Sequence, residues 1–129
     1  MGRDPRHRRG RRGELAALVL LWLKGHRLRH RNWSCAAGEL DLVMSRGREV
    51  VFVEVKTRSS DAFGGAAAAV DARKRQQMVR VASVYLGRFG LWERPTRFDV
   101  VLVERGVGLL GWRLRHIRSA FRADTGRAL

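Results

Sequence analysis

The chain has 129 residues, of which 45% are hydrophobic and one is cysteine, and its formal net charge is +15. This length suits one domain with a continuous core, and a single thiol excludes an intrachain disulfide and a cysteine-rich zinc cluster, so a reducing, cytoplasmic setting is expected. A basic domain should attract polyanions, of which nucleic acid is the commonest in a cytoplasm, although arginine-rich genome composition could also explain the charge.

The first twelve residues, MGRDPRHRRGRR, are rich in arginine and poor in apolar side chains. We expect residues 1–12 to form a disordered tail that contacts phosphates without specificity. The domain itself is expected over residues 13–122, and residues 123–129 should form a C-terminal tail. The apolar run at 15–23 imitates a secretory signal, but Glu14 before it and Lys24 after it oppose export. The run is also shorter than the ~20 residues that span a bilayer, so no membrane association is predicted.

An apolar helix is predicted over residues 14–26, ending at Gly25. Glu14 lies in its first turn, where a favourable interaction with the helix dipole would explain an acid without any function. Strands are then predicted over 28–33, 39–45 and 49–57, the last two forming a hairpin. Residues 58–65 should form a loop beside the end of the third strand, where a substrate could be gripped.

A second, amphipathic helix is predicted over residues 71–89, because apolar side chains recur there at helical spacing. Two more strands, 97–104 and 109–117, complete the order α-β-β-β-α-β-β. This order predicts an α/β fold with a mixed central β-sheet flanked by α-helices. The candidate nucleic-acid-binding residues are Arg58, Arg73, Lys74, Arg75 and Arg80. A solvated helix face explains the charges of this helix equally well.

Four ionisable side chains lie on the two strands of the predicted hairpin. Because successive side chains of a strand point to opposite faces, Asp41 shares a face with Glu39, and Glu54 shares one with Lys56. Carboxylates in a run as apolar as residues 50–53 are costly to bury unless something compensates their charge, and a divalent cation is the usual compensation. The segment therefore predicts a metal site.

Hydrolysis of a phosphodiester needs an activated water and neutralisation of charge in the transition state, which one or two Mg²⁺ or Mn²⁺ ions can supply. Asp41, Glu54 and one backbone carbonyl would form a sufficient inner shell. Lys56 would orient the water or steady the developing charge. Glu14 could add a further ligand if the first helix starts over the pocket.

Two more acids, Glu39 and Asp99, are further candidates, although structural roles explain them equally well. The competing interpretation of the whole group is a cross-strand salt-bridge cluster in which Lys56 neutralises Glu54 or Asp41. The apolar surroundings of Glu54 favour a functional site. The four histidines show no ligand spacing to one another, so no zinc site is predicted.

Several blocks of this sequence also occur in a known family. They are Gly-x-x-Gly-Glu at 10–14, Arg31-Asn32, GELDL at 38–42, VFVEVKTR at 51–58, Phe63-Gly64, RFDV at 97–100 and HIRSAF at 116–121. Through these blocks the chain resembles the YraN family of bacterial proteins. That family is similar to archaeal Holliday-junction resolvases and to the PD-(D/E)XK nuclease superfamily, so the resemblance implies a restriction-endonuclease-like fold. It also implies that Asp41, Glu54 and Lys56 occupy the catalytic acid, acid and lysine positions, with Glu14 at the extra acid position typical of resolvases.

The predicted function is therefore a Mg²⁺- or Mn²⁺-dependent endonuclease that hydrolyses phosphodiester bonds in DNA, with branched or damaged DNA as candidate substrates. The alternative is a nucleic-acid-binding or assembly module that keeps the fold without turnover. Resolvase-like folds often pair across a two-fold axis, so a homodimer is plausible, although the sequence names no interface.

Overall fold

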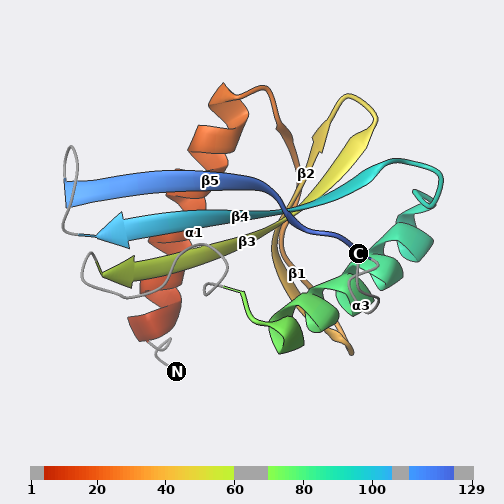
Figure 1. Ribbon diagram of the computed structural model, residues 1–129, viewed down its shortest axis with the longest axis horizontal. Helices are drawn as coiled ribbons and strands as arrows, with labels where there is room; N and C mark the ends of the chain where they lie inside the picture. The colour runs from red at the N-terminus through yellow and green to blue at the C-terminus, as the bar shows by residue number, and fades with distance from the viewer. Residues whose placement is uncertain (1–4, 60–69, 106–110, 124–129) are drawn as a thin grey trace.

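A computed structural model describes residues 5–59, 70–105 and 111–123 of the chain. Its elements are α1 (Pro5–Leu23), β1 (Arg27–Cys35), β2 (Gly38–Arg46), β3 (Glu49–Ser59), α3 (Ala72–Phe89), β4 (Thr96–Arg105) and β5 (Trp112–Phe121). The strands form one sheet in the order β1-β2-β3-β4-β5, in which β3 and β4 are parallel and the other neighbours are antiparallel (Figure 1). The predicted α/β architecture, a mixed central sheet flanked by helices, is confirmed.

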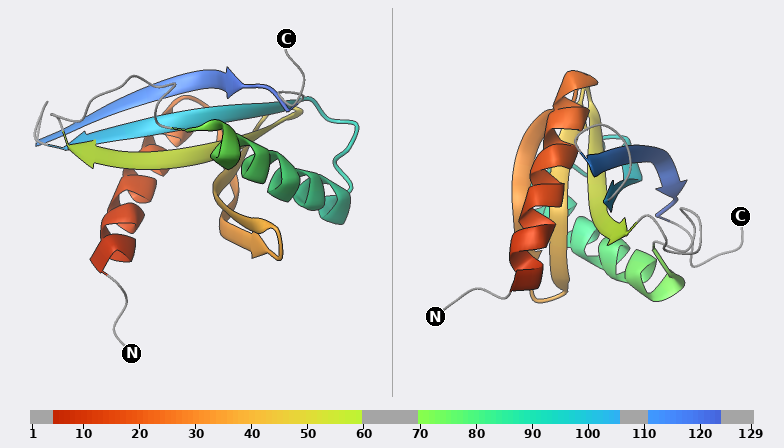
Figure 2. Two further views of the ribbon diagram at one scale, coloured as in Figure 1. Left: turned by 60° about the horizontal axis from the view of Figure 1, so that its bottom comes forward. Right: turned by 90° about the vertical axis from the view of Figure 1, so that its left-hand side faces the viewer.

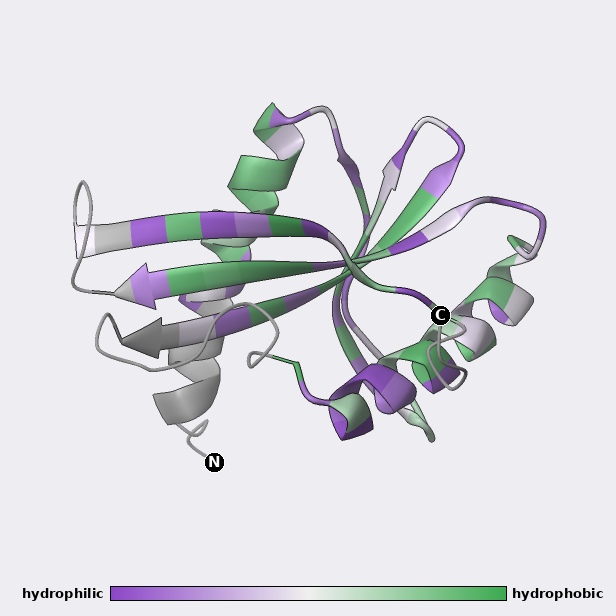
Figure 3. Cartoon of the chain, viewed as in Figure 1, coloured by the Kyte–Doolittle hydropathy of each residue, from purple (hydrophilic) through white to green (hydrophobic). Residues whose placement is uncertain are grey.

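Helices α1 and α3 cover opposite faces of the sheet. Val51 and Val53 of β3 pack in the cluster that contains α1, whereas Val50 and Phe52 pack in the cluster that contains α3. Successive residues of a strand point to opposite faces, so these two cores lie on the two sides of β3, which passes between the helices in the right-hand view of Figure 2. Burial on both faces explains why the central strands are apolar over long runs, as Figure 3 shows for β4.

Helix α1 begins at Pro5, nine residues before the predicted start at Glu14. The expectation of a disordered tail over residues 1–12 is therefore wrong for residues 5–12, which have helical backbone, while residues 1–4 lie outside the described part. Proline is well suited to a first helical turn and arginine is a good helix former, which explains the early start. The helix ends before Gly25, as predicted, where a positive φ of 92° turns the chain and the His26 N–H donates to Leu21 O at 3.0 Å.

Strands β2 and β3 separate part of the way along their length. β2 pairs with β1 as far as Cys35 and Gly38, but it pairs with β3 only from Leu42 onward. The free end of the β1–β2 hairpin packs against α3 instead. Gly38 has a φ of 142°, and a Cβ there would lie 2.6 Å from the side-chain nitrogen of Gln77, so only glycine permits this approach. Asp41 therefore lies where the β2–β3 ladder has ended.

The second half of the chain follows the prediction more closely. Helix α3 begins after Asp71, whose side chain accepts a hydrogen bond from Lys74 N at 2.8 Å, and it ends at Gly90 with a φ of 66°. β5 runs on to Phe121, beyond the predicted end at residue 117, because the buried Phe121 ring stacks on Phe98 with the ring centroids 4.8 Å apart. The predicted loop at 58–65 falls outside the described residues from position 60 onward. No helix in the described ranges is both long and apolar enough to cross a membrane.

Candidate functional site

Three acidic side chains from three elements meet where β2 and β3 separate. Asp41 comes from β2, Glu54 from β3 and Glu14 from α1, and the two glutamates are each only 8% exposed. Glu14 reaches the sheet because the preceding residue is Gly13. A Cβ on Gly13 would lie 2.5 Å from the Thr57 hydroxyl, so the absence of a side chain lets α1 lie directly on β3. The sequence prediction that Glu14, Asp41 and Glu54 share one site agrees with this arrangement.

The pKa of Asp41 is shifted by burial and by the two neighbouring acids. Burial raises its pKa, and so do a hydrogen bond with Glu54, the charge of Glu54 and the charge of Glu14, bringing it to about 9. The Val55 N–H opposes this shift by donating to Asp41 Oδ2 at 2.8 Å, where the β2–β3 ladder has ended. Asp41 therefore keeps its proton at neutral pH and donates a hydrogen bond to Glu54.

The charge of Glu54 is neutralised by a lysine on α3. Its Oε2 lies 3.1 Å from Lys74 Nζ on α3, and Lys74 also donates to Gln77 Oε1 at 3.3 Å. Lys56 stands two residues after Glu54 on the same face of β3 and is exposed. The competing interpretation, a salt bridge from Lys56, is not what the structure shows for Glu54, because Lys74 supplies the ion pair.

This site offers few side chains that could bind a metal ion. Among the described residues, no group of three or more His, Cys, Asp or Glu side chains is spaced to hold a metal ion. The hydrogen-bonded pair of Asp41 and Glu54 is thus the centre of the candidate site, and Glu14 acts on it through its charge. Mg²⁺ prefers oxygen ligands and keeps several waters, so a pair of carboxylates is chemically suited to it.

The other two candidate acids do not join this pair. Glu39 is exposed on β2 opposite Ser34 of β1, and it is not among the groups that shift the pKa of Asp41. Asp99 is fully buried on β4 next to Val101, on the face that α1 covers, whereas Glu54 faces α3. The structure therefore separates Glu39 and Asp99 from the Asp41–Glu54 pair.

The basic residues of α3 are in different situations. Arg73 and Arg80 are exposed, and the first turns of α3 are strongly hydrophilic (Figure 3). Arg75 is held instead within the fold, because its Nε donates to Val70 O at 3.0 Å. Of Arg58 only the backbone position on β3 is described. Arg73 and Arg80 are thus the members of the predicted set that present open charge to a partner.

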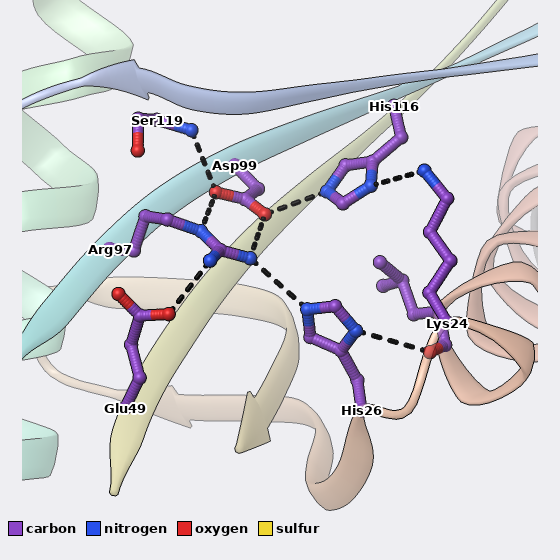
Figure 4. Close-up of polar contacts among 8 residues, drawn as sticks. Lys24, His26, Glu49, Arg97, Asp99, His116 and Ser119 are labelled. Carbon is purple, nitrogen blue, oxygen red and sulfur yellow. Dashed lines mark hydrogen bonds and ion pairs between the residues drawn. The ribbon is translucent and has the colours of Figure 1, made fainter. Parts of the chain in front are cut away.

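A second polar cluster, which the sequence did not predict, is centred on Asp99 (Figure 4). Asp99 accepts hydrogen bonds from Arg97 Nε at 2.7 Å, Arg97 Nη2 at 2.8 Å, His116 Nε2 at 2.7 Å and the Ser119 N–H at 2.9 Å. Burial alone would raise the pKa of Asp99, but these hydrogen bonds and the charge of Arg97 lower it to about 2. Asp99 is therefore a buried, fully ionised structural centre.

Arg97 extends the cluster to the end of α1. Its Nη1 donates to Glu49 Oε1 at 2.7 Å, and its Nη2 lies 3.1 Å from His26 Nε2 (Figure 4). A guanidinium can only donate, so His26 Nε2 must accept, and His26 Nδ1 donates to Leu21 O at 3.2 Å. His26 is therefore neutral, in line with its burial, which lowers its pKa.

The tautomer of His116 follows from its hydrogen-bond partners in the same way. Lys24 Nζ lies 3.0 Å from His116 Nδ1, so this nitrogen accepts and Nε2 carries the proton donated to Asp99. A signal for part of the cluster was present in the sequence, since Arg97 and Asp99 stand two apart on one strand face. No sequence signal pointed to His26 and His116, because the contacts that join them to β4 depend on the fold.

The chain belongs to a protein family whose description states no activity. Residues 13–103 match the model of a family described as "Uncharacterised protein family UPF0102", which is the YraN-like group. A UPF0102 protein of Moorella thermoacetica is 51% identical over 76% of this chain and 82% of its own length. A UPF0102 protein of Ectopseudomonas mendocina is 49% identical over 88% of this chain and 94% of its own length.

One solved structure is similar at a low level. It is described as the structure of Pyrococcus furiosus SfsA in complex with Ca²⁺, and it matches with a TM-score of 0.36 and 12% sequence identity. The match covers 81% of this chain and 58% of that one.

Proposed function

We propose that this chain, which belongs to the uncharacterised protein family UPF0102, is a metal-dependent nuclease that hydrolyses phosphodiester bonds in DNA. The observation that carries the proposal is the buried, proton-sharing pair of Asp41 and Glu54 beside Glu14. Perturbed carboxyl groups of this kind are concentrated at functional sites.

Burying Asp41 and Glu54 side by side costs free energy. Two carboxylates in hydrogen-bond contact cannot both ionise in a buried site, so a proton remains between Asp41 and Glu54 at neutral pH. A divalent cation can replace that proton and neutralise both charges together. Structural packing alone gives no reason to place acids from α1, β2 and β3 together where the β2–β3 ladder ends.

A cation bound there would supply Lewis-acid stabilisation of the phosphate and a more acidic water. The protein residues have separate duties around it. Asp41 and Glu54 would hold the ion, while Glu14 would strengthen the negative field. The Val55 N–H fixes the Asp41 carboxyl, so the ligand is oriented before substrate arrives.

Lys56 and Lys74 have different roles at this site. Lys56 is exposed on the strand face of Glu54 and is placed to orient the attacking water or to steady the charge that develops on the phosphate. Lys74 neutralises Glu54 through the 3.1 Å ion pair and is the group that an incoming cation must compete with. Lys74→Met should therefore tighten cation binding, whereas Lys56→Met should lower turnover and leave cation affinity nearly unchanged.

The substrate class follows from charge. The chain carries a formal net charge of +15, and Arg73 and Arg80 extend exposed positive charge along α3, the helix that also holds Glu54 through Lys74. Such a surface attracts the phosphate backbone of nucleic acid. We take DNA as the favoured substrate and branched or damaged DNA as the candidates to test first.

Cleavage assays test the proposal. Labelled four-way junction, flap, duplex and single-stranded DNA would be incubated with the full chain and Mg²⁺ or Mn²⁺. We expect metal-dependent cleavage that Glu54→Gln and Asp41→Asn abolish, because each replacement removes a negative ligand while keeping the shape of the side chain. Glu39→Gln is the matched control, since Glu39 is an exposed acid on β2, the strand of Asp41, and lies outside the Asp41–Glu54 pair.

The alternative of a binding module makes the opposite prediction. Salt-sensitive DNA binding that is indifferent to metal, with no cleavage of any substrate, would contradict the nuclease and favour a module without turnover. Cleavage that survives Glu54→Gln would show that the activity lies elsewhere.

A further inference from the structure

A separate pocket opens at the far end of α1. It has a volume of about 250 Å³ and is lined by Lys24, His26, Arg46, His116 and Arg118. Lys24 follows Glu14 by ten positions, so along the helix axis the pocket is ~15 Å from the acidic site. All of the lining residues are basic or imidazole side chains, and they come from the segment that follows α1, the last residue of β2 and β5.

The imidazole walls of the pocket are fixed and neutral. Both nitrogens of His26 are engaged, with Leu21 O and with Arg97, and both nitrogens of His116 are engaged, with Asp99 and with Lys24 (Figure 4). These two rings therefore shape the pocket without adding charge. Their hydrogen bonds are anchored in the buried Asp99 cluster, so the wall is preorganised.

The positive charge of the pocket comes from its rim. Lys24 has one N–H directed at His116 Nδ1 and two others to offer, and Arg46 and Arg118 are exposed guanidinium groups. Arg46 reaches back to the turn after α1, where its Nε would be 4.0 Å from a Cβ on Gly25. The rim thus presents three cations toward one space, and the two acids behind it, Asp99 and Glu49, are both paired with Arg97.

We propose that this pocket binds a phosphate group through Lys24, Arg46 and Arg118. A tetrahedral phosphate presents several acceptor oxygens, which guanidinium groups bind in pairs of parallel hydrogen bonds. A site of this size holds the group together with some of its water. The phosphate belongs either to a nucleic acid, at an end or in the backbone, or to free phosphate in solution.

Calorimetric titration of the full chain with inorganic phosphate is the first test. Arg46→Gln and Arg118→Gln are each expected to weaken phosphate binding about tenfold, because each removes a charged hydrogen bond. Arg48→Gln is the matched control, since Arg48 is an exposed arginine two residues after Arg46 and does not line the pocket. No binding of phosphate by the wild type, or equal affinity in all three variants, would overturn the proposal.

A second titration distinguishes the sources of the phosphate. It compares a short oligonucleotide bearing a 5′-phosphate with the same oligonucleotide lacking it. Tighter binding of the phosphorylated strand that Arg46→Gln removes would assign the pocket to nucleic-acid ends. Equal binding of the two strands, reduced by Arg46→Gln in both, would assign it to the backbone. Equal binding that Arg46→Gln leaves unchanged would assign it to free phosphate.

The inference stands apart from the nuclease proposal, because it uses none of the acidic residues. Asp41→Asn should leave phosphate affinity unchanged, and Arg46→Gln should leave Mn²⁺ affinity unchanged. Failure of one proposal is therefore visible while the other holds.

Discussion

At the scale of single residues, Asp41 makes the stability of the protein depend on pH. Its pKa is raised from 3.8 to about 9, so it favours the folded state only while it keeps its proton. That contribution is complete below the ordinary pKa of an aspartate and is lost as the pH rises through the folded value. In the absence of divalent metal, stability attributable to Asp41 should therefore fall between about pH 4 and pH 9.

Asp41→Asn tests this dependence, because an amide has the shape of the acid and no charge to suppress. We expect the variant to be more stable than the wild type at about pH 8 and to differ much less at about pH 4. Urea denaturation with a chelator present, followed by circular dichroism across this range, measures both curves. Parallel curves for the two proteins would show that Asp41 ionises normally.

Arg97 is the residue on which the second cluster depends. It is 7% exposed and is shared by Asp99, Glu49 and His26, so its removal strands an ionised carboxylate in the core. Breaking a buried pair from one side costs about 3–5 kcal/mol. We expect Arg97→Met to lower the free energy of unfolding by that amount, measured by urea denaturation at neutral pH.

Arg115→Met provides the comparison for this variant. The Arg115 guanidinium lies 3.9 Å from Glu104 and is half exposed, so its loss should cost about 0–1 kcal/mol. If Arg97→Met cost no more than Arg115→Met, the Asp99 cluster would not be the stabilising centre that its geometry indicates.

At the scale of elements, the contact between α1 and β3 depends on one glycine. In a helix interior, Ala is normally favoured over Gly by about 1 kcal/mol. At Gly13 the new Cβ would meet the Thr57 hydroxyl at 2.5 Å, so we expect Gly13→Ala to destabilise the protein by about 1–3 kcal/mol. Thermal or urea denaturation measures the change.

A double-mutant cycle locates the cause of that loss. Thr57→Ala removes the atom in collision, so Gly13→Ala should cost less in that background than in the wild type. Gly87→Ala in α3 is a control, because its added methyl would meet mainly the exposed Trp92 ring, which can move. A Gly13→Ala protein as stable as the wild type would mean that α1 does not lie as close to β3 as described.

The order and type of the elements could be predicted because their signals are local. Apolar alternation and turn glycines lie within each segment, and the α3 boundaries at Asp71 and Gly90 follow from cap chemistry. The misses have long-range causes. The end of β5 is set by Phe121 stacking on Phe98, and the separation of β2 from β3 is set by packing of the hairpin on α3.

At the scale of the whole molecule, only the part of the candidate site that depends on local sequence signals could be predicted. Strand parity and the resemblance pointed to Asp41 and Glu54, and the structure brings them into hydrogen-bond contact. Lys74 was placed among nucleic-acid-binding residues, because nothing in its own segment shows that α3 passes over Glu54. Homodimerisation stays a prediction.

Nucleic-acid binding should show the electrostatics of the molecule as a whole. With B-DNA, the slope of log K against log salt changes by about 0.9 for each phosphate contact that is lost. We expect the double variant Arg73→Gln, Arg80→Gln to flatten the slope, as measured by fluorescence anisotropy over a range of salt. Arg31→Gln, which replaces an exposed arginine on β1, should change it less. An unchanged slope in the double variant would place the DNA on another surface.

The most direct test of the central claim is calorimetric titration of Mn²⁺ into the protein, repeated in two buffers of different ionisation enthalpy. If Asp41 and Glu54 exchange their shared proton for a cation, the wild type should bind Mn²⁺ and release about one proton per ion near neutral pH, and Asp41→Asn should lose both effects. Absence of Mn²⁺ binding, or binding that releases no proton and is unchanged in Asp41→Asn, would contradict a metal site at this pair.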